Sequence, residues 1–322
     1  MLGKTSRIYV SGHQGLVGSA IVRRLLRDGM TNIVTASRTE LDLRSQDDVN
    51  QWFSEHRPEI VVIAAGTVGG IIANSTRPAE FIYDNIMIHS NIIESSRKSG
   101  VAKLLYLSSG CIYPKESLQP LREEFLMSGK MEETNVWYGV AKLAGIKMCQ
   151  AYRRQYGLDF ISAIPATIYG PGDNFDPNNS HVIPGIIHKM YQANKKDDKV
   201  IRLWGSGRPR REFLFVDDLA DAAIFLLNKY SDEEPINIGI GSDVAVAVLA
   251  ELIKSRIAPT IEIEFDQTQP DGVPQMLLDS SRINAMGWNH SVLLEDGLRR
   301  TIDWYVKRRE NGDDIRGFLS SR

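Results

Sequence analysis

The sequence predicts a doubly wound α/β fold, in which helices cover both faces of a parallel sheet, with a smaller, mainly helical lobe attached. Two observations support this fold class. In the first half of the chain, short β-branched runs such as Arg7–Val10 and Ile60–Ala65 alternate with amphipathic stretches such as Gly15–Asp28. Such apolar strands are typical of a parallel sheet buried on both faces. After Tyr169 the chain becomes rich in Pro, Gly, Asp and Asn, which do not propagate regular structure.

The elements follow in chain order. In the first half we expect strands at Arg7–Val10, Asn32–Ala36, Ile60–Ala65, Leu104–Leu107 and Ile161–Ile164, and helices at Gly15–Asp28, Ser45–His56 and Tyr138–Tyr156. In the second half we expect helices at Val182–Asn194, Asp217–Asn228, Val244–Arg256 and Leu294–Arg309, and strands at Val200–Leu203, Glu212–Phe215, Ile236–Ile238 and Thr260–Phe265. We expect the lobes to interleave: residues 1–170, 212–240 and about 277–288 form the sheet domain, and residues 171–211, 241–276 and 289–322 form the helical lobe.

Composition excludes several classes of protein. Hydrophobic residues make up 43% and charged residues 24% of the 322 residues, as in an average soluble globular protein. The formal net charge of −2 provides no general attraction to nucleic acid or to an anionic membrane, so we expect neither partner. The cysteines, Cys111 and Cys149, lie in no Cys-x-x-Cys or Cys/His cluster, so neither a metal site nor a disulfide framework is expected. The chain shows no signal-peptide pattern and no membrane-length apolar run, which predicts a cytoplasmic protein.

A glycine-rich turn follows the first strand. Gly12, Gly15 and Gly18 are spaced as in a turn that leads directly into a helix. Glycines permit the tight turn, and the free amides at the helix N-terminus, together with the helix dipole, favour a pyrophosphate. The alternative is an ordinary glycine turn, but the position after the first strand favours a Rossmann-type dinucleotide site.

The second strand indicates which dinucleotide binds. It ends Thr35-Ala-Ser-Arg38, without the acidic residue that usually binds the ribose hydroxyls of NAD. Arg38 can pair with a 2'-phosphate, which predicts NADP(H), although a solvated surface arginine is the alternative. Asp42 and Leu43 are expected beside the adenine, with helix capping as an alternative for Asp42.

A possible catalytic pair lies further along. Ser109 follows a buried strand, and Tyr138 and Lys142 are four residues apart, on one face of a predicted helix. We expect the Lys142 ammonium to lower the pKa of Tyr138 towards the range of an acid-base catalyst. Exposed Tyr-x-x-x-Lys pairs are common by chance, so the catalytic interpretation depends on the preceding strand and the glycine turn.

The glycine turn, Ser109, Tyr138 and Lys142 resemble the extended short-chain dehydrogenase/reductase superfamily. Further segments resemble the GDP-L-fucose synthase family: Val68-Gly-Gly-Ile-Ile-Ala-Asn, Ser109-Gly-Cys-Ile-Tyr-Pro, Tyr169-Gly-Pro-Gly-Asp-Asn-Phe, Asn179-Ser-His-Val-Ile-Pro and Trp204-Gly-Ser-Gly-Arg-Pro-Arg-Arg-Glu-Phe-Leu. The resemblance extends over nearly the whole chain.

This resemblance implies an NADPH-dependent enzyme that converts GDP-4-keto-6-deoxy-D-mannose to GDP-L-fucose by epimerising C3 and C5 and then reducing the C4 ketone. Tyr138 would protonate O4, Ser109 would hydrogen-bond the same oxygen, and Lys142 would hold the nicotinamide ribose. Cys111 and His181 would be the base and the acid of the epimerisation. Without the resemblance, Cys111 would be interpreted as a small buried hydrophobe and His181 as a polar loop residue.

The resemblance also implies binding residues and a partner. Cofactor contacts beyond those named above would come from Leu16, Val17, Ala64, Ala65, Pro165, Ile168 and His181. Trp204 would lie against the guanine or ribose and Arg211 would pair with phosphate, although a core tryptophan and a surface arginine are the alternatives. A twofold homodimer would pack through the helices around Tyr83–Ser99 and Thr134–Tyr156.

Several positions depart from the family pattern. Gln14, Thr67 and the pair Gln275-Met276 stand where the family usually has a basic residue, and Ala166-Thr167 replaces Thr-Asn. Arg208 and Arg210 are the nearest cations in the sequence that could compensate at the diphosphate. An enzyme that reduces or epimerises a different keto nucleotide sugar is therefore the alternative function, and a non-catalytic NADP-sensing protein is a more remote one.

Overall fold

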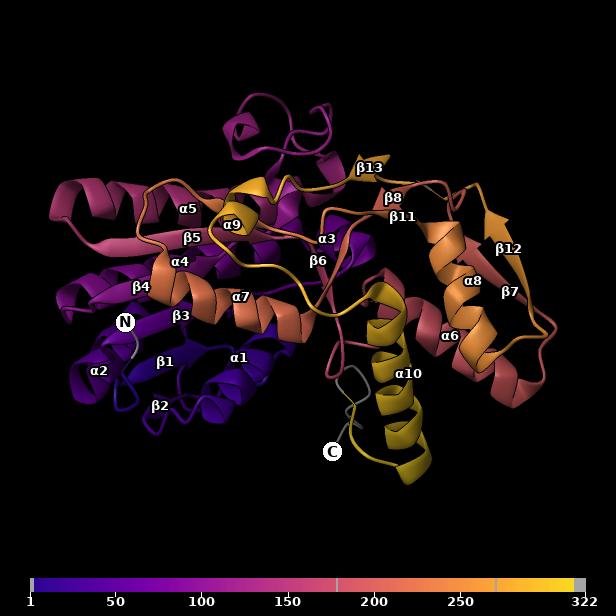
Figure 1. Cartoon of the computed structure of the whole chain (residues 1–322), viewed down its shortest axis with the longest axis horizontal. Helices are drawn as coiled ribbons and strands as arrows, with labels where there is room; N and C mark the ends of the chain where they lie inside the picture. The colour runs from indigo at the N-terminus through magenta and orange to yellow at the C-terminus, as the bar shows by residue number, and fades with distance from the viewer. Residues whose placement is uncertain (1–2, 178, 270, 316–322) are drawn as a thin grey trace.

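A six-stranded parallel sheet forms the centre of the larger lobe (Figure 1). The computed structural model describes residues 3–177, 179–269 and 271–315, so residues 1–2, 178, 270 and 316–322, which the sequence analysis assigned to one lobe or the other, lie outside it. The strand order is β10-β5-β4-β3-β1-β2, and every pairing is parallel. The strands are β1 (Ile8–Ser11), β2 (Ile33–Val34), β3 (Ile60–Ile63), β4 (Lys103–Leu107), β5 (Asp159–Pro165) and β10 (Ile236–Ile238).

Helices cover both faces of this sheet, which confirms the predicted doubly wound fold (Figure 1). On one face α1 (Leu16–Arg27) packs against α7 (Val216–Lys229). On the other, α4 (Pro78–Lys98) packs against both α2 (Gln46–His56) and α5 (Val136–Tyr156). Each helix buries an apolar stripe against strands that are almost completely buried, as expected for a parallel sheet between two helical layers.

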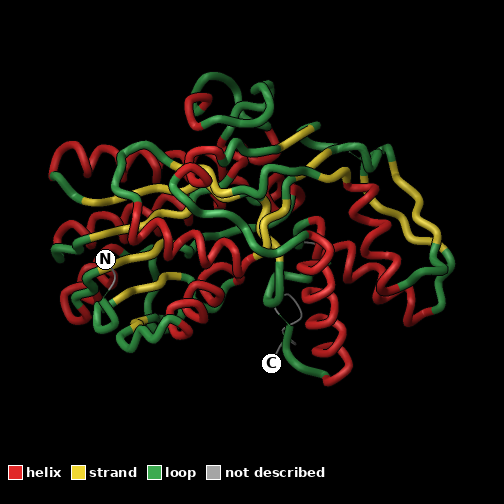
Figure 2. The backbone as a smooth tube through the Cα atoms, in the orientation of Figure 1, coloured by secondary structure: helices red, strands yellow, loops and turns green. Residues whose placement is uncertain are grey.

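The smaller lobe has a hydrophobic core of its own. Figure 2 shows its helices and short strands beside the larger lobe. Its helices are α6 (Val182–Lys196), α8 (Val246–Ile257) and α10 (Leu294–Asn311). Two small sheets complete it: β7 (Val200–Trp204) with β12 (Glu262–Asp266), and β8 (Arg210–Arg211) between β11 (Val244–Ala245) and β13 (Gln275–Met276). Val244 and Ala245, expected in a helix, pair with β8 instead, so α8 begins at Val246.

Two short strands join the lobes. β6 (Thr167–Tyr169) pairs with β9 (Phe213–Phe215). Side chains alternate along β9, so Leu214 belongs to the core of the larger lobe while Phe213 and Phe215 belong to that of the smaller one.

Glu212, expected to begin this strand, lies between β8 and β9 with a buried side chain. Its carboxylate accepts hydrogen bonds from the backbone amides of Ile240, Gly241 and Leu278, at 2.6, 2.7 and 2.9 Å. Burying a carboxylate is tolerated when several donors satisfy it. Glu212 therefore connects its own segment to two others that are distant in the sequence.

Among the described helices, none has the length and apolarity needed to cross a membrane.

Candidate active site

A cleft of about 800 Å³ lies at the carboxyl ends of the strands, between the two lobes. In the sheet, β1 lies between β2 and β3, so the strand order reverses beside it. Ligands of open α/β sheets bind at such a reversal. Every residue that the sequence analysis assigned to catalysis, to cofactor binding or to substrate binding lines this cleft except Gly18, and the two compensating candidates Arg208 and Arg210 do not.

The three glycines of the turn have different structural roles. Gly12 has a φ of +71°, and a Cβ there would lie 2.8 Å from the backbone of Ala65, so only glycine fits. Gly15 is the N-cap of α1, whose first amides therefore face the cleft beside Leu16 and Val17. Gly18 does not line the cleft. A Cβ there would overlap the Gly12 carbonyl oxygen, so Gly18 allows the helix to pack against the turn. This cradle suits a pyrophosphate at a helix N-terminus.

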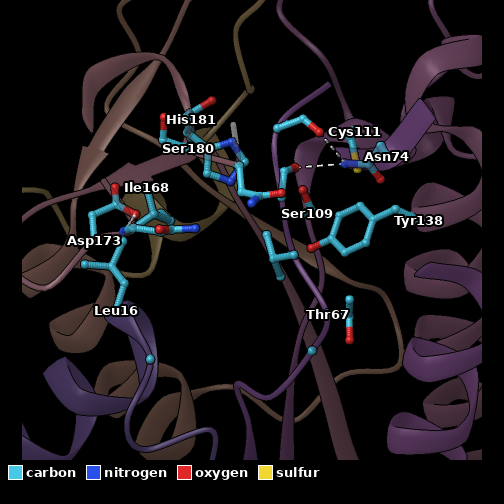
Figure 3. Close-up of a pocket in the computed structure, with 18 of the residues that line it drawn as sticks. Leu16, Thr67, Asn74, Ser109, Cys111, Tyr138, Ile168, Asp173, Ser180 and His181 are labelled. Carbon is cyan, nitrogen blue, oxygen red and sulfur yellow. Dashed lines mark hydrogen bonds between the residues drawn. The ribbon is translucent and has the colours of Figure 1, made fainter. Parts of the chain in front are cut away.

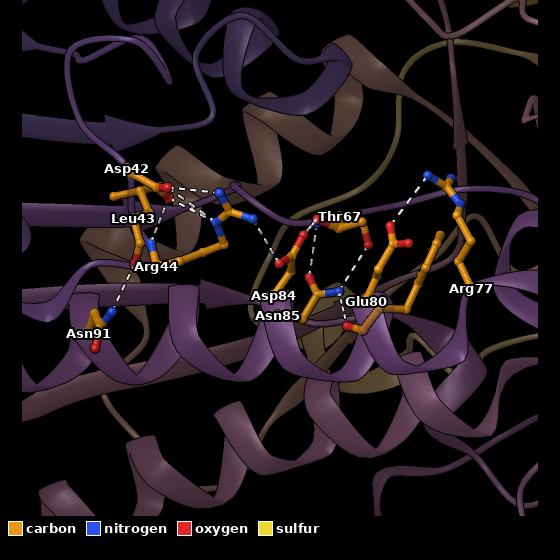
Figure 4. A network of polar contacts seen from close by, with 10 residues as sticks. Asp42, Leu43, Arg44, Thr67, Arg77, Glu80, Asp84, Asn85 and Asn91 are labelled. Atoms are coloured by element: carbon orange, nitrogen blue, oxygen red, sulfur yellow. Dashed lines mark hydrogen bonds and ion pairs between the residues drawn. The ribbon is translucent and has the colours of Figure 1, made fainter.

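At the end of the cleft where an adenine was expected, the side chain of Asp42 is held by an arginine (Figure 4). The Arg44 guanidinium donates to Asp42 at 2.8 Å and to Asp84 of α4 at 3.2 Å. The hydrogen bonds that Asp42 accepts from the guanidinium and from the backbone amide of Arg44 lower the pKa of Asp42 to about 2. The helix-capping alternative for Asp42 is wrong, because Ser45 caps α2 by accepting from the Asp48 amide. Arg38 is exposed at the mouth of the cleft.

Tyr138 and Lys142 meet Ser109 in the middle of the cleft. Lys142 is only 5% exposed, its Nζ donates to the Leu107 carbonyl oxygen at 3.0 Å, and it lies 5.8 Å from the centre of the Tyr138 ring. Behind it, the Tyr106 hydroxyl donates to the Lys142 carbonyl oxygen at 3.3 Å and also meets His89 Nδ1 at 3.0 Å. The lysine is thus held by backbone and buried aromatic groups.

The expected lowering of the Tyr138 pKa is wrong for this arrangement. Burial raises the pKa of Tyr138, with a smaller rise from the neighbouring Cys111, and a hydrogen bond with Ser109 opposes the rise. Burial also lowers the pKa of Lys142 to about 8. Removal from water penalises both charged forms, and this effect exceeds the attraction between them.

Cys111 and His181 lie on opposite sides of the cleft (Figure 3). Cys111 is in the short 3₁₀ turn after Ser109, and His181 is the N-cap residue of α6 in the other lobe. Burial raises the pKa of the Cys111 thiol, whereas a hydrogen bond with Ser109 and the charge of Lys142 lower it. A ligand between the two residues would present one face to each.

The other end of the cleft is formed by the smaller lobe. Trp204 is 53% exposed, so it is not a core tryptophan, and the Lys189 Nζ lies 5.7 Å from the centre of its ring. Arg211 faces the same space, near the carboxylates of Asp271 and Glu132. Asp271 is held by the turn after Trp204, where it accepts from the Ser206 amide at 2.6 Å.

Gln275 and Met276, which replace a pair of basic residues of the family pattern, face in different directions. Met276 lines the cleft, whereas Gln275 does not and donates to Asp243 at 2.6 Å. Arg210 pairs with the same Asp243 at 2.7 Å, and Arg208 donates to Ser206. Neither arginine lines the cleft, so the expectation that they compensate at the diphosphate is wrong. Within the described part of the chain, Lys189 is the cation that lines this end of the cleft together with Arg211, beside the ring of Trp204.

Sequence reasoning missed Lys189, Asp271 and Asn74. Lys189 lies eight residues after His181, about two helical turns along α6, which places both on one face. That spacing was a usable signal. Asp271 precedes Gly272 in a turn, and Asn74 lies in the quoted Val68–Asn74 segment, but neither has a spacing that predicts its place in the cleft.

Comparison with known proteins agrees with the geometry. The model of the NAD dependent epimerase/dehydratase family matches residues 8–239. GDP-L-fucose synthase 1 of Arabidopsis thaliana is 50% identical over 307 residues, which cover 95% of each chain. A GDP-6-OMe-4-keto-L-xylo-heptose reductase from C. jejuni superposes with a TM-score of 0.90 at 34% identity, covering 95% of this chain and 99% of its own. A GDP-L-fucose synthetase from Naegleria fowleri bound to NADP gives 0.88 at 26% identity, covering 96% and 97%. The predicted resemblance is confirmed: the chain belongs to the NAD dependent epimerase/dehydratase family and, within it, to the GDP-L-fucose synthase family.

Proposed function

We propose that this protein converts GDP-4-keto-6-deoxy-D-mannose to GDP-L-fucose, with epimerisation at C3 and C5 and NADPH-dependent reduction at C4. One observation carries the proposal. A dinucleotide cradle, a Ser109–Tyr138–Lys142 group and an opposed Cys111–His181 pair all line a single cleft.

Reduction of the ketone would use the residues at the centre of the cleft. NADPH bound against the glycine turn supplies the hydride. Tyr138 donates its phenolic proton to O4, and the Ser109 hydroxyl hydrogen-bonds the same oxygen. The raised pKa of Tyr138 keeps the phenol protonated until the alkoxide forms, which suits a general acid. Lys142 would provide positive charge near the developing alkoxide and would hydrogen-bond the nicotinamide ribose.

Epimerisation would use the two sides of the cleft. The C4 ketone acidifies the hydrogens on C3 and C5, so a base can remove one of them to leave an enolate. Inversion requires that the proton return on the other face. Cys111 and His181 supply groups on the two faces. Burial raises the pKa of the Cys111 thiol, and the hydrogen bond with Ser109 and the charge of Lys142 offset part of that rise. This division of roles is supported by position, because the two side chains belong to different lobes.

An enzyme acting on another GDP-linked keto sugar is the second candidate. The C. jejuni relative is named as a reductase of a methylated keto-heptose, so similar chains act on other sugars. Met276, in place of a basic residue, also changes the wall next to Cys111. The non-catalytic alternative is disfavoured because Tyr138 and Lys142 are both present and lie together.

We also propose that the two hydrophobic cores correspond to two functional units. The larger unit, residues 1–170, 212–240 and about 277–288, would bind NADP(H), and the smaller would bind the GDP part. A twofold homodimer is proposed through α4 and α5. Tyr83 of α4 and Trp137 of α5 are 59% and 47% exposed, and both could be covered by a second copy that packs on these helices. Light scattering after gel filtration measures the oligomeric state.

The function is tested by incubating the protein with NADPH or NADH and a panel of keto nucleotide sugars, followed by nicotinamide absorbance and by identification of the product. We expect turnover of GDP-4-keto-6-deoxy-D-mannose with a preference for NADPH. Arg38→Ala should reduce that preference about ten- to hundredfold, because it removes a charged contact to phosphate. If another sugar nucleotide is turned over faster, the second candidate replaces the first. Equal kcat/KM for both cofactors in the parent would contradict the role of Arg38.

A further inference from the structure

We infer that Tyr106 is a positioning residue for Lys142, because its ring covers the lysine ammonium and favours the charged form; this inference rests on the proposed function. Tyr106 lies in β4 and Lys142 in α5. The Tyr106 side chain is completely buried and does not line the cleft, whereas Lys142 does. Tyr106 therefore acts on a ligand only through the lysine.

The ring of Tyr106 forms one side of the space around the ammonium. The Lys142 Nζ lies over this ring, 5.3 Å from its centre, and donates to the carbonyl oxygen of Leu107, the next residue of the strand, at 3.0 Å. The negative face of an aromatic ring attracts a cation, and does so more strongly where water is excluded. Lys142 is almost completely buried, so the ring stabilises a charge that burial disfavours.

Contacts at the hydroxyl end fix the orientation of the Tyr106 ring. The hydroxyl meets His89 Nδ1 of α4 at 3.0 Å and donates to the Lys142 carbonyl oxygen at 3.3 Å. The His89 ring also lies edge-on to the Tyr106 ring, with 4.9 Å between the ring centres. The hydroxyl is thus tied to both helices, and the ring cannot turn its face away from the ammonium without breaking these contacts.

The packing of α5 is adapted to the same ring. Gly145 lies three residues after Lys142 in this helix. A Cβ at Gly145 would overlap both the ring and the hydroxyl of Tyr106, so the glycine allows the helix to approach the strand. The close approach that places Lys142 over the ring therefore depends on Tyr106 and Gly145 together.

The other titratable groups that face Lys142 keep one protonation state near pH 8. Burial raises the pKa of Tyr106, Tyr138 and Cys111, so these groups stay protonated. Burial, and then the charge of Lys142, lower the pKa of His89 well below its usual value, so His89 is neutral. A change of charge near pH 8 in this group therefore belongs to Lys142, whose pKa is about 8.

The experiment measures the Lys142 pKa by NMR titration of protein that contains lysine enriched in ¹³C at Cε. The signal that is missing in Lys142→Arg assigns the residue. Tyr106→Leu should lower the midpoint by about 0.5–1.5 pH units, the shift that corresponds to the loss of a ring face from a desolvated cation. Tyr106→Phe keeps the ring, and Ser108 still donates to the Lys142 carbonyl oxygen at 3.3 Å. Its midpoint should stay within about 0.3 pH units of the parent. The pH at which turnover falls should move with the midpoint in each variant.

Tyr9→Leu is the matched control, because Tyr9 is an equally buried tyrosine of β1 that packs against Trp52 and Phe53. Both leucine variants should lose stability, but only Tyr106→Leu should shift the midpoint. Tyr106→Met replaces Tyr106→Leu if the latter does not fold.

An unchanged or raised midpoint in Tyr106→Leu would overturn the inference. An equal decrease in Tyr9→Leu would mean that general loosening of the core causes the shift, and an equal decrease in Tyr106→Phe would assign it to the hydroxyl; either result makes the inference wrong. The titration needs no substrate. The proposed function fails separately, if the parent does not turn over the GDP-linked ketone.

Discussion

The cofactor end and the sugar-nucleotide end of the cleft are built in different ways. The cofactor cradle comes from one short stretch, Gly12–Gly18, in which each glycine has a local steric reason. The other end is assembled from His181, Lys189, Trp204, Arg211, Asp271 and Met276, which belong to several segments of the smaller lobe. If the proposed roles of the two ends hold, a contiguous motif binds the cofactor, whereas substrate identity depends on how separate segments pack. The following predictions test this contrast, starting with the group between the two ends.

Tyr138→Phe should have the largest effect. It removes the proton donor for O4, and general acid catalysis is worth about 10²- to 10⁴-fold, so hydride transfer should fall by that factor. Exchange of solvent deuterium at the carbons flanking the ketone should persist, because it depends on Cys111 and His181. Mass spectrometry of recovered substrate measures the exchange, and Cys111→Ala is the converse variant. Undiminished exchange in Cys111→Ala would reduce Cys111 to a packing role.

Gly12→Ala should break the cofactor end alone. The new methyl group would meet the Ala65 backbone and would strain a φ of +71°, so NADPH binding should weaken by at least about tenfold. Gly29→Ala is the control, since Gly29 has a φ of +79° but nothing within 4 Å of its Cβ position. Both variants should lose about 1–3 kcal/mol of stability, measured by urea unfolding, but only the first should lose NADPH affinity. Equal NADPH affinity in the two would show that close approach at Gly12 is unimportant.

Arg211→Ala and Arg210→Ala separate neighbouring arginines at the nucleotide end. Arg211 lines the cleft, so its loss should raise the KM for the nucleotide sugar about ten- to hundredfold and leave NADPH binding unchanged. Arg210 pairs with Asp243 outside the cleft and should have little effect on either constant. Steady-state kinetics with each substrate varied in turn checks both expectations. An equal effect of the two changes would mean that the arginines stabilise the lobe rather than bind phosphate.

The pH dependence of reduction should report Lys142. Burial lowers the pKa of Lys142 to about 8. The side chain is therefore protonated well below that pH and loses its charge as the pH rises through that value. Turnover should therefore fall above pH 8, by up to about tenfold per pH unit. The titratable groups facing Lys142 do not cause this fall: burial raises the pKa of Tyr138, Cys111 and Tyr106, and lowers that of His89. Lys142→Arg keeps its charge, so any residual activity should lack this inflection. An unchanged inflection would assign it to another group.

Met276→Lys should have the smallest effect and concerns substrate identity. A cation restored in the cleft should tighten GDP binding by up to about 1–2 kcal/mol, offset in part by desolvation of the ammonium. Gln275→Lys is the control, because Gln275 lies outside the cleft beside Asp243. Calorimetric titration with GDP, UDP, CDP and dTDP compares the nucleotides. A parent that prefers a pyrimidine nucleotide would contradict the fucose-synthase assignment.

Much of the larger lobe could be predicted because its signals are local. Apolar strands alternate with amphipathic helices, Gly12 and Gly15 lie between β1 and α1, and Tyr138 and Lys142 are four positions apart. The smaller lobe was harder, because its short strands pair with distant partners. The local sequence predicts a helix at Val244 and Ala245, for example, but these residues form a strand because they pair with Arg210 and Arg211.

The sequence by itself determined the fold class, the glycine turn and the pairing of Tyr138 with Lys142 on one helix, because each depends on residues that are close in the chain. Only the tertiary structure decided that Met276 faces the cleft and Gln275 does not, that Lys189 accompanies Trp204, and that the Lys142 ammonium lies over the Tyr106 ring. It also decided the sign of the Tyr138 pKa shift. The physical reason is common to all four. Burial and facing direction arise from segments that meet only in the folded chain, and removal from water can outweigh the pairwise attraction that spacing predicts.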